Sequence, residues 1–214
     1  MPTGRYSLHD PHDDTPLGDE RFSCAPGPSG WRYVSSTFAP DGTPDGSVDL
    51  TLDSLGRPVR LQLRAGAWQI RGGLMDGLSW VRTPLDMDPD TTAEHTTDGN
   101  AHAHAFTGRS PAFALAAARI LRAAPGGLRP GATTRLRLVA LAHPVLAART
   151  LDQGWTYEGS EAHPTDNGPL TVERYTVADL ETGEQSTLHI AGDVLLAAPG
   201  VELEDLDTPP NQGV

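Results

Sequence analysis

Two histidines stand one residue apart at His102 and His104, a spacing that places both imidazoles on one face of a β-strand. Such a pair can present two ligands to a metal ion, and Glu94 and His95 lie close enough in sequence to complete a facial set. Exposed histidines in a polar loop are the alternative, and we favour it. Since the chain has a single cysteine and no thiolate cluster, we expect neither a bound metal nor another cofactor.

An acidic run over residues 86–90 has alternating carboxylates, as calcium loops do. Calcium loops also need a glycine at the sixth position and a glutamate at the twelfth, and here Thr91 and Thr97 stand in those places. We therefore do not expect a calcium site.

A second cluster runs from Asp152 to His163. Gln153, Trp155 and Tyr157 alternate onto one face of a predicted strand, where an amide beside two aromatic rings can form the wall of a ligand site or part of the core. We predict a ligand cleft with an arginine anchoring an acidic group, because arginine is the only strong cation in the chain. The predicted lining residues are Trp68, Trp80, Phe113, Arg137, Gln153, Trp155 and Tyr157.

Three carboxyl groups flank the same aromatic strand: Asp152, Glu158 and Glu161. If the protein is an enzyme, these groups are the candidates for acid–base catalysis, and solvated loop residues are the alternative. The chain contains no G-x-S-x-G elbow and no G-x-G-x-x-G motif that opens a helix after a strand. The usual signatures of serine hydrolases and dinucleotide-binding folds are therefore missing.

Period-two alternation of apolar and polar residues dominates the chain after residue 20 and predicts β-strands bounded by Gly, Pro, Asn and Asp. The clearest case is a hairpin over Val48–Arg64, with Val48, Leu50, Leu52, Val59, Leu61 and Leu63 facing the core. Further strands are expected at Ala67–Arg71, Leu78–Arg82, Thr133–Ala142, Ala147–Tyr157, Pro169–Ala178, Ser186–Ile190 and Val194–Leu203, with a break at Gly72-Gly73.

One segment has helical spacing instead. Ser110 is a good N-cap, proline follows at the first helical position, and Pro125 with two glycines ends the pattern. The sequence therefore predicts a helix over residues 111–124. Between Pro84 and Thr107 we expect a long acidic loop.

The composition fits a mainly β protein with a rolled or half-barrel antiparallel sheet of about ten strands and this one helix. The 214 residues include 23 glycines and 19 prolines and suffice for one domain with a sizeable core. We expect a single domain over residues 1–214, with residues 1–20 and 205–214 flexible.

The net charge of −12 disfavours nucleic acid and anionic membranes as partners. The single Cys24, the polar start of the chain and the short apolar stretches predict a cytoplasmic protein without membrane insertion. All 16 basic residues are arginines, which is typical of GC-rich, for example actinobacterial, genomes. The oligomeric state stays open.

The order of several short motifs resembles the bacterial putative glycolipid-binding family over about Trp31 to Leu203. The matching positions are Gly66-Ala67-Trp68 with Gly72 or Gly73, then Asp86 and Asp88, then Gln153. Where that family carries a T-P-F-T-N-T stretch, this chain has the acidic segment and His102–Phe106. The resemblance implies a spiral or rolled antiparallel β-structure around an apolar cleft.

These observations predict that the protein binds a lipid-like or other amphipathic small molecule in an apolar cleft of the rolled sheet. A cofactor-independent cyclase or isomerase of a specialised-metabolite pathway, using carboxyl groups in the same cleft, is the alternative. A third possibility is an accessory protein without a ligand, which would show a large exposed apolar patch.

Overall fold

The structure is a computed structural model that describes residues 1–27, 30–85, 88–165 and 168–211. It confirms a mainly β fold, with one mostly antiparallel sheet of 15 strands and two short helices. The helices are α1 (Pro89–His95) and α2 (Pro111–Ala123). The strands are β1 (Thr3–His9), β2 (Pro16–Gly27), β3 (Gly30–Phe38), β4 (Pro44–Asp53), β5 (Pro58–Ala65), β6 (Trp68–Met75), β7 (Gly77–Pro84), β8 (Thr97–Ala101), β9 (Ala105–Thr107), β10 (Thr133–Ala142), β11 (Ala147–Thr165), β12 (Gly168–Asp179), β13 (Gln185–Ala191), β14 (Val194–Ala198) and β15 (Val201–Leu206).

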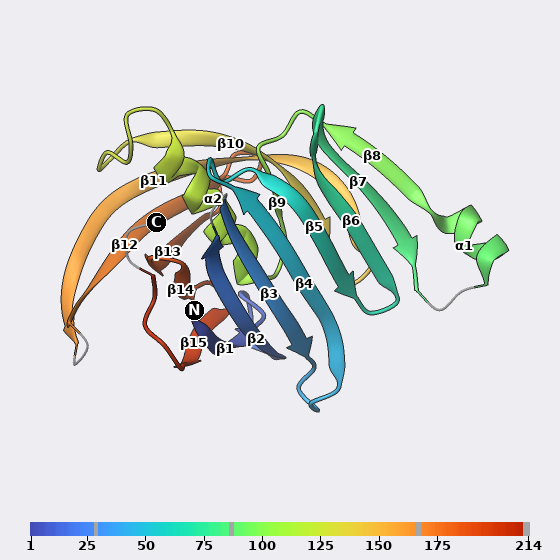
Figure 1. Ribbon diagram of the computed structural model, residues 1–214, viewed down its shortest axis with the longest axis horizontal. Coiled ribbons are helices and arrows are strands. Elements are labelled where there is room, and N and C mark those ends of the chain that lie inside the picture. Colours follow the sequence, from blue (N-terminus) through green and yellow to red (C-terminus); the bar gives the residue numbers. More distant parts are fainter. Residues whose placement is uncertain (28–29, 86–87, 166–167, 212–214) are drawn as a thin grey trace.

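The strands form two meanders joined at the chain termini. The first runs from β8 back to β1, the second runs from β15 back to β9, and β1 pairs with β15 in the middle of the sheet. The sheet rolls around α2, while β8 and α1 form its far end (Figure 1). β9 pairs with β10 in parallel, and the other ladders are antiparallel.

The predicted helix is confirmed and lies inside the roll. Ser110 is its N-cap and accepts a hydrogen bond from the Ala112 N–H at 3.3 Å. Contacts with β4, β9 and β14 bring α2 against both meanders. The turn between β4 and β5 packs so closely on α2 that a Cβ at Gly56 would lie 2.7 Å from the Ile120 nitrogen. A glycine at this turn therefore permits the helix to sit inside the sheet.

An aromatic cluster fills the roll under the first meander. The ring of Phe22 stacks on Tyr6 at 4.6 Å and on Tyr33 at 5.6 Å, and Trp31 lies 5.7 Å from Tyr33. All four side chains are buried, as are the inward-facing leucines of β4 and β5. Aromatic packing of this kind leaves little free space in the interior.

The hairpin of β4 and β5 is confirmed, with one correction. Asp49 lies opposite Gln62 and Thr51 lies opposite Arg60, but the register shifts next to Leu52. Because of this irregularity Pro58 is buried, and Val59 is 47% exposed instead of facing the core. The strict alternation expected at the start of the second strand was wrong at that residue.

Three other expectations about the elements need correction. β6 continues through Gly72-Gly73, which pair with Trp80 and Ser79 of β7. Gly72 is a glycine at a close contact and not a strand break, since a Cβ there would be 2.9 Å from the Phe106 ring. The segment after Pro84 is not one long loop, since it holds α1, β8 and β9. The expected strand over Val194–Leu203 is divided into β14 and β15 by a turn at Gly200, where φ is +70°.

The terminal segments expected to be flexible carry regular structure. β1 and β2 are central strands of the sheet, and β15 extends to Leu206. Tyr6 and Glu20 are fully buried. The acidic residues between them lie mostly in the exposed turn around Asp13. The acidic composition of the segment therefore gave no sign that some of its residues face the interior.

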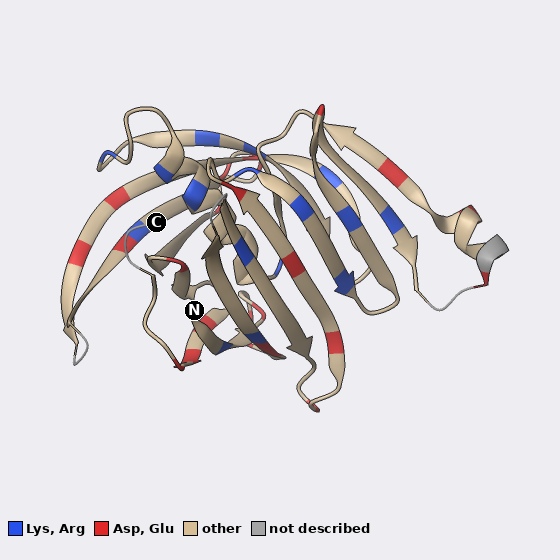
Figure 2. Ribbon diagram, viewed as in Figure 1, with Lys and Arg blue, Asp and Glu red and all other residues tan. Residues whose placement is uncertain are grey.

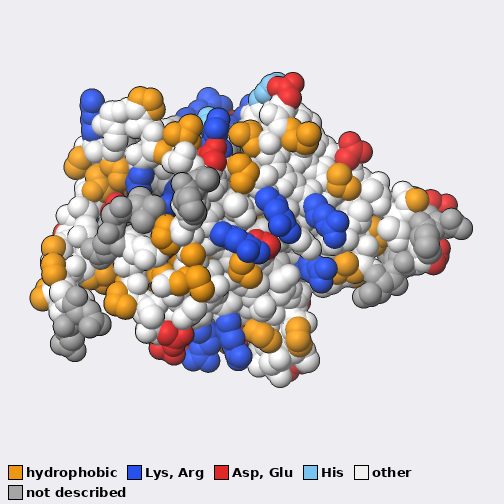
Figure 3. Space-filling model, in the orientation of Figure 1, with side chains coloured by type: hydrophobic (Ala, Val, Ile, Leu, Met, Phe, Trp, Pro, Cys, Tyr) orange, Lys and Arg blue, Asp and Glu red, His pale blue; other side chains and the backbone are white. Residues whose placement is uncertain are grey.

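Basic and acidic residues are interspersed along the strands of the sheet (Figure 2). The face in Figure 3 has scattered apolar side chains and a group of basic ones over the first meander. The strand arginines at positions 60, 64, 71, 135 and 137 are all exposed. Among the described residues, no helix is long and apolar enough to cross a membrane.

Candidate ligand-binding cavity

A cavity of about 510 Å³ lies between α2 and the inner face of the second meander. Its volume falls within the range of about 300–1,000 Å³ that is usual for small-molecule sites. The helix contributes Pro111, Phe113, Ala114 and Ala117 to the wall. The opposite wall consists of inward-facing apolar side chains of successive strands, which are Leu138, Trp155, Val177, Leu188 and Leu195.

One end of the cavity is polar. Thr107, Gly108 and Arg109 lie there just before the N-terminus of α2, and Gln153 lies opposite on β11. A second hollow of about 580 Å³ is lined by these same four residues. The two spaces therefore meet at Arg109 and Gln153, with an apolar wall on one side of the junction and a more open region on the other.

The side chains of Trp155 and Gln153 on β11 are hydrogen-bonded to each other. The indole Nε1 donates a hydrogen bond of 3.0 Å to Oε1 of Gln153, so the buried indole has its polar atom satisfied. Tyr175 meets the Trp155 ring edge-on at 5.9 Å, and the ring of Tyr157 lies 5.5 Å from Tyr175. Of the three residues predicted to share this face, Gln153 and Trp155 line the cavity and Tyr157 does not.

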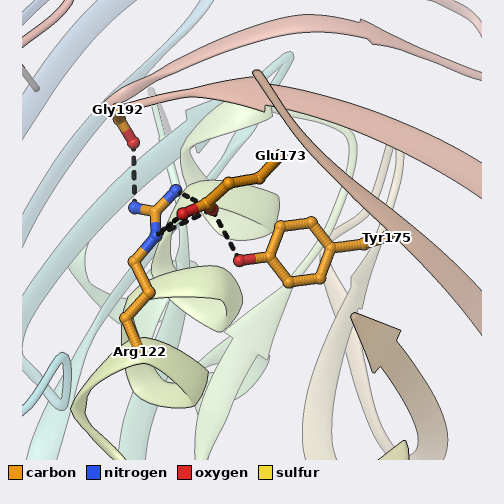
Figure 4. A network of polar contacts seen from close by, with 4 residues as sticks. All are labelled: Arg122, Glu173, Tyr175 and Gly192. Atoms are coloured by element: carbon orange, nitrogen blue, oxygen red, sulfur yellow. Dashed lines mark hydrogen bonds and ion pairs between the residues drawn. The ribbon is translucent and has the colours of Figure 1, made fainter. Parts of the chain in front are cut away.

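A buried ion pair fixes the C-terminal end of α2 to the second meander (Figure 4). Arg122 donates from Nε and Nη2 to Oε2 of Glu173 at 2.9 and 2.6 Å, and from Nη1 to the Gly192 carbonyl at 2.8 Å. The Tyr175 hydroxyl donates to the same carboxylate at 2.7 Å. Burial lowers the pKa of Arg122, but hydrogen bonds and charge from Glu173 outweigh it and raise the pKa. The ion pair therefore stabilises the charged form of Arg122 and holds its side chain against Glu173.

A second polar cluster fixes the N-terminal end of α2. Oε1 of Glu20 accepts hydrogen bonds from the hydroxyls of Ser110, at 2.7 Å, and Tyr33, at 2.8 Å. Burial raises the pKa of Glu20, although these hydroxyls and the charge of Arg109 oppose that shift. Since Glu20 belongs to β2, the cluster connects the helix that covers the cavity with the packed first meander.

Of the seven predicted ligand-binding residues, the structure brings Phe113, Gln153 and Trp155 to the cavity. The other four lie outside its wall. Trp68 lies beneath Arg82, whose guanidinium carbon is 3.4 Å from the ring centre, and Trp80 packs against Gly99 of β8.

Arg137 and Tyr157 lie on strands next to the cavity without lining it. The Arg137 side chain is exposed on β10. Tyr157 is displaced along β11, where it packs against Tyr175. The ligand roles of all seven residues stay predictions.

The three carboxyl groups proposed for catalysis lie away from the cavity. Asp152 forms an ion pair of 2.7 Å with Arg135, and that hydrogen bond lowers the pKa of the carboxyl. Glu158 and Glu161 line a separate hollow of about 300 Å³ near His163 and His189. The catalytic roles remain untested predictions.

The histidine pair has a structural partner on β10. Nδ1 of His104 accepts a hydrogen bond of 2.9 Å from the Arg137 backbone N–H, and His102 is exposed. Asp88 caps α1 by accepting from Thr91 N, while Asp86 lies outside the described residues. Across the described ranges, no group of three or more His, Cys, Asp or Glu side chains is arranged to hold a metal ion.

Sequence reasoning missed Arg109 and Glu20. Glu20 follows four other acidic residues, and composition alone made that segment look solvated. Its position two residues from buried Phe22 on a strand is the signal that places it on the inner face. Arg109 lies directly before the N-cap of α2, so its place at the cavity depends on how the helix enters the roll.

Together, the rolled sheet and the covered cavity define a β-barrel-like protein with an internal space beside a helix. No protein-family model matches the chain, and neither does any curated protein. Among solved structures, the chain is similar to a beta-barrel-like protein of the domain of unknown function DUF1849 from Brucella abortus. The TM-score is 0.51 and the identity 16%, over 96% of each chain. This similarity shows the fold alone.

A DUF1089 family protein from Pseudomonas aeruginosa is also similar. The TM-score is 0.49 and the identity 15%, over 85% of this chain and 89% of that chain.

Proposed function

We propose that the protein binds a lipid-like or other amphipathic small molecule in the cavity between α2 and the second meander. One observation carries the proposal: a partly open space of about 510 Å³ whose wall combines apolar side chains of α2 and the second meander with polar ones such as Arg109, Gln153 and Asp179. Apolar walls bind a hydrocarbon or ring system, and a few convergent polar groups orient it. The motif resemblance to the putative glycolipid-binding family supports the same class of ligand.

Native mass spectrometry of protein purified without detergent tests whether an amphiphile is already bound. The same protein, once delipidated, is titrated with the neutral dye Nile red, whose emission rises in an apolar site. We expect one site per chain and displacement of the dye by fatty acids, fatty alcohols and glycolipids. If no amphiphile copurifies and none displaces the dye, the proposal is wrong.

Tryptophan variants locate the site. Trp155→Ala removes a wall residue and should weaken binding by about 2 kcal/mol, the size of a hot-spot truncation. Trp80→Ala is the control, because Trp80 lies outside the cavity against Gly99. Equal losses in the two variants, with circular dichroism showing both folded, would place the ligand elsewhere.

The alternative of an acid–base enzyme has no comparable support. The ion pair with Arg135 favours the ionised form of Asp152, while Glu158 and Glu161 lie on another hollow. Nothing in the geometry of the cavity favours turnover over binding.

A further inference from the structure

The two hollows that meet beside α2 differ in their polar groups, and one cation lies at their junction. Arg109 lines the cavity of about 510 Å³, the hollow of about 580 Å³ and a small space of about 20 Å³ next to Glu20. The Arg109 side chain is half-buried. Across the described ranges, no hydrogen bond and no ion pair engages its guanidinium.

Among the described residues, half-buried Arg119 has no ion pair either, but its guanidinium packs on the ring of Trp31, whereas Arg109 lines two hollows. Arg122, which is also largely shielded from solvent, is held by Glu173, and exposed Arg32 is held by both carboxylate oxygens of Asp49. A guanidinium that has lost part of its hydration is stabilised when an anion binds it with two parallel hydrogen bonds. Arg109 lines both hollows, so an anion in the space between them can reach its guanidinium.

In the described part of the chain, no carboxyl group around this space forms a hydrogen bond or an ion pair with Arg109. Glu20 is fully buried, its Oε1 accepts from two hydroxyls, and it interacts with Arg109 through charge alone. Asp179 accepts from the backbone of the turn after β12, and Asp10 accepts from the His12 N–H. Asp45 and Glu184 also border the hollows, but neither forms an ion pair with Arg109.

We propose that the bound amphiphile is an anion whose head group, a carboxylate or a similar oxyanion, binds the Arg109 guanidinium. Its apolar part then lies along Phe113, Leu138 and Trp155. Gln153 faces the same junction, and its amide N–H₂ remains available because Trp155 uses only its carbonyl oxygen. The inference rests on the proposed binding function and specifies the chemical class of the ligand.

Two ligands with the same tail separate the head-group contact from binding in general. Decanoate and decanol, each below its aggregation concentration and at constant ionic strength, are measured by displacement of Nile red. For the wild-type protein we expect decanoate to bind at least about tenfold more tightly than decanol, as one charge-assisted contact of about 1.4 kcal/mol gives. Arg109→Gln should lower the affinity for decanoate to that for decanol and change the decanol affinity less than about twofold.

Arg71→Gln is the matched control, because Arg71 is exposed on β6 and lines neither hollow. It should leave both affinities unchanged. Arg109 has no partner whose loss would unfold the protein, and the unchanged affinity for decanol verifies an intact cavity. If both ligands bind the wild type equally well, or if Arg109→Gln weakens both alike, the proposal of an anionic head group at Arg109 is wrong. The proposed binding function would still stand. If neither ligand displaces the dye, both proposals fail for this class of compound.

Discussion

The two meanders of the sheet present similar alternating strands to the same helix, yet one side is packed and the other encloses a cavity. Under the first meander, stacked rings of Tyr6, Phe22 and Tyr33 fill the space against α2. Under the second, Val177, Trp155 and Ala117 line a space of about 510 Å³. The alternating pattern alone therefore does not decide whether a rolled sheet forms a core or a site.

The helix separates these two environments, and its ends are fixed differently. At the C-terminal end, Arg122 and Glu173 form an ion pair with the cavity side. At the N-terminal end, the Ser110 hydroxyl donates to the buried carboxyl of Glu20, which belongs to β2 on the packed side. Because both ends are anchored, α2 keeps its place between the packed first meander and the cavity, although it also contacts β9 and β14.

The largest expected effect tests the packed side. Leu61→Asp places an unpaired charge in the core beneath β5, where Leu61 is 1% exposed, and should lower the free energy of unfolding by about 4 kcal/mol or more. Urea denaturation measures the loss. Val59→Asp, two residues earlier on the same strand, is the control and should cost about 1 kcal/mol or less, because Val59 is half exposed. Similar losses would show that the register of β5 is misplaced.

A smaller loss is expected when the anchor on the cavity side is removed. Glu173→Leu leaves the Arg122 guanidinium largely buried without its carboxylate, which should cost about 3 kcal/mol in urea denaturation. Glu181→Leu removes the partner of exposed Arg149 and should cost about 1 kcal/mol or less. If both variants are equally stable, the ion pair does not hold the helix in place.

Much of the fold could be predicted because its strands alternate clearly and its helix has both end signals. β10 and α2 have nearly the bounds expected from the sequence. The order of the strands in the sheet and the division into a packed and an open side could not be predicted. These depend on contacts between residues far apart in the chain, such as Glu20 with Ser110.

The candidate site was predicted in part for the same reason. Alternation on one strand identified Gln153 and Trp155, since neighbours two residues apart share a face. Arg137 was chosen as a strand arginine that could anchor an acidic group, since arginine is the only strong cation in the chain, but its side chain is exposed on β10. The cation that reaches the cavity, Arg109, comes from a loop whose path no periodicity encodes.

The pH dependence of stability tests whether the pKa of Glu20, the buried carboxyl that joins the helix to the first meander, is raised. Burial raises the pKa of Glu20, so the folded protein retains a proton that the unfolded chain releases near the usual pKa of about 4.3. The contribution of Glu20 to the free energy of unfolding should therefore be greatest below that value and decline as pH rises through the raised pKa, with a slope of up to about 1.4 kcal/mol per pH unit.

Glu20→Gln removes this titration and retains an oxygen acceptor for Ser110 and Tyr33. Denaturation curves of both proteins, measured over a pH series, isolate the contribution of Glu20, because the other groups titrate alike in each. The wild type should lose stability relative to the variant with rising pH. Parallel profiles would mean that Glu20 titrates as it does in the unfolded chain.

The smallest effect on stability is expected within the cavity itself. Ala114 lies on its wall, so Ala114→Leu extends a side chain into free space and should change the free energy of unfolding by less than about 0.5 kcal/mol. Ala118, one turn further along α2, is fully buried and does not line the cavity, so Ala118→Leu should overpack the interior and cost about 1–3 kcal/mol. Because both changes add the same atoms to the same helix, helix propensity cancels between them. Ala114→Leu should also displace Nile red by occupying its space. If the two variants are equally destabilised, the cavity is closed in solution, and the difference between the two sides of the roll disappears with it.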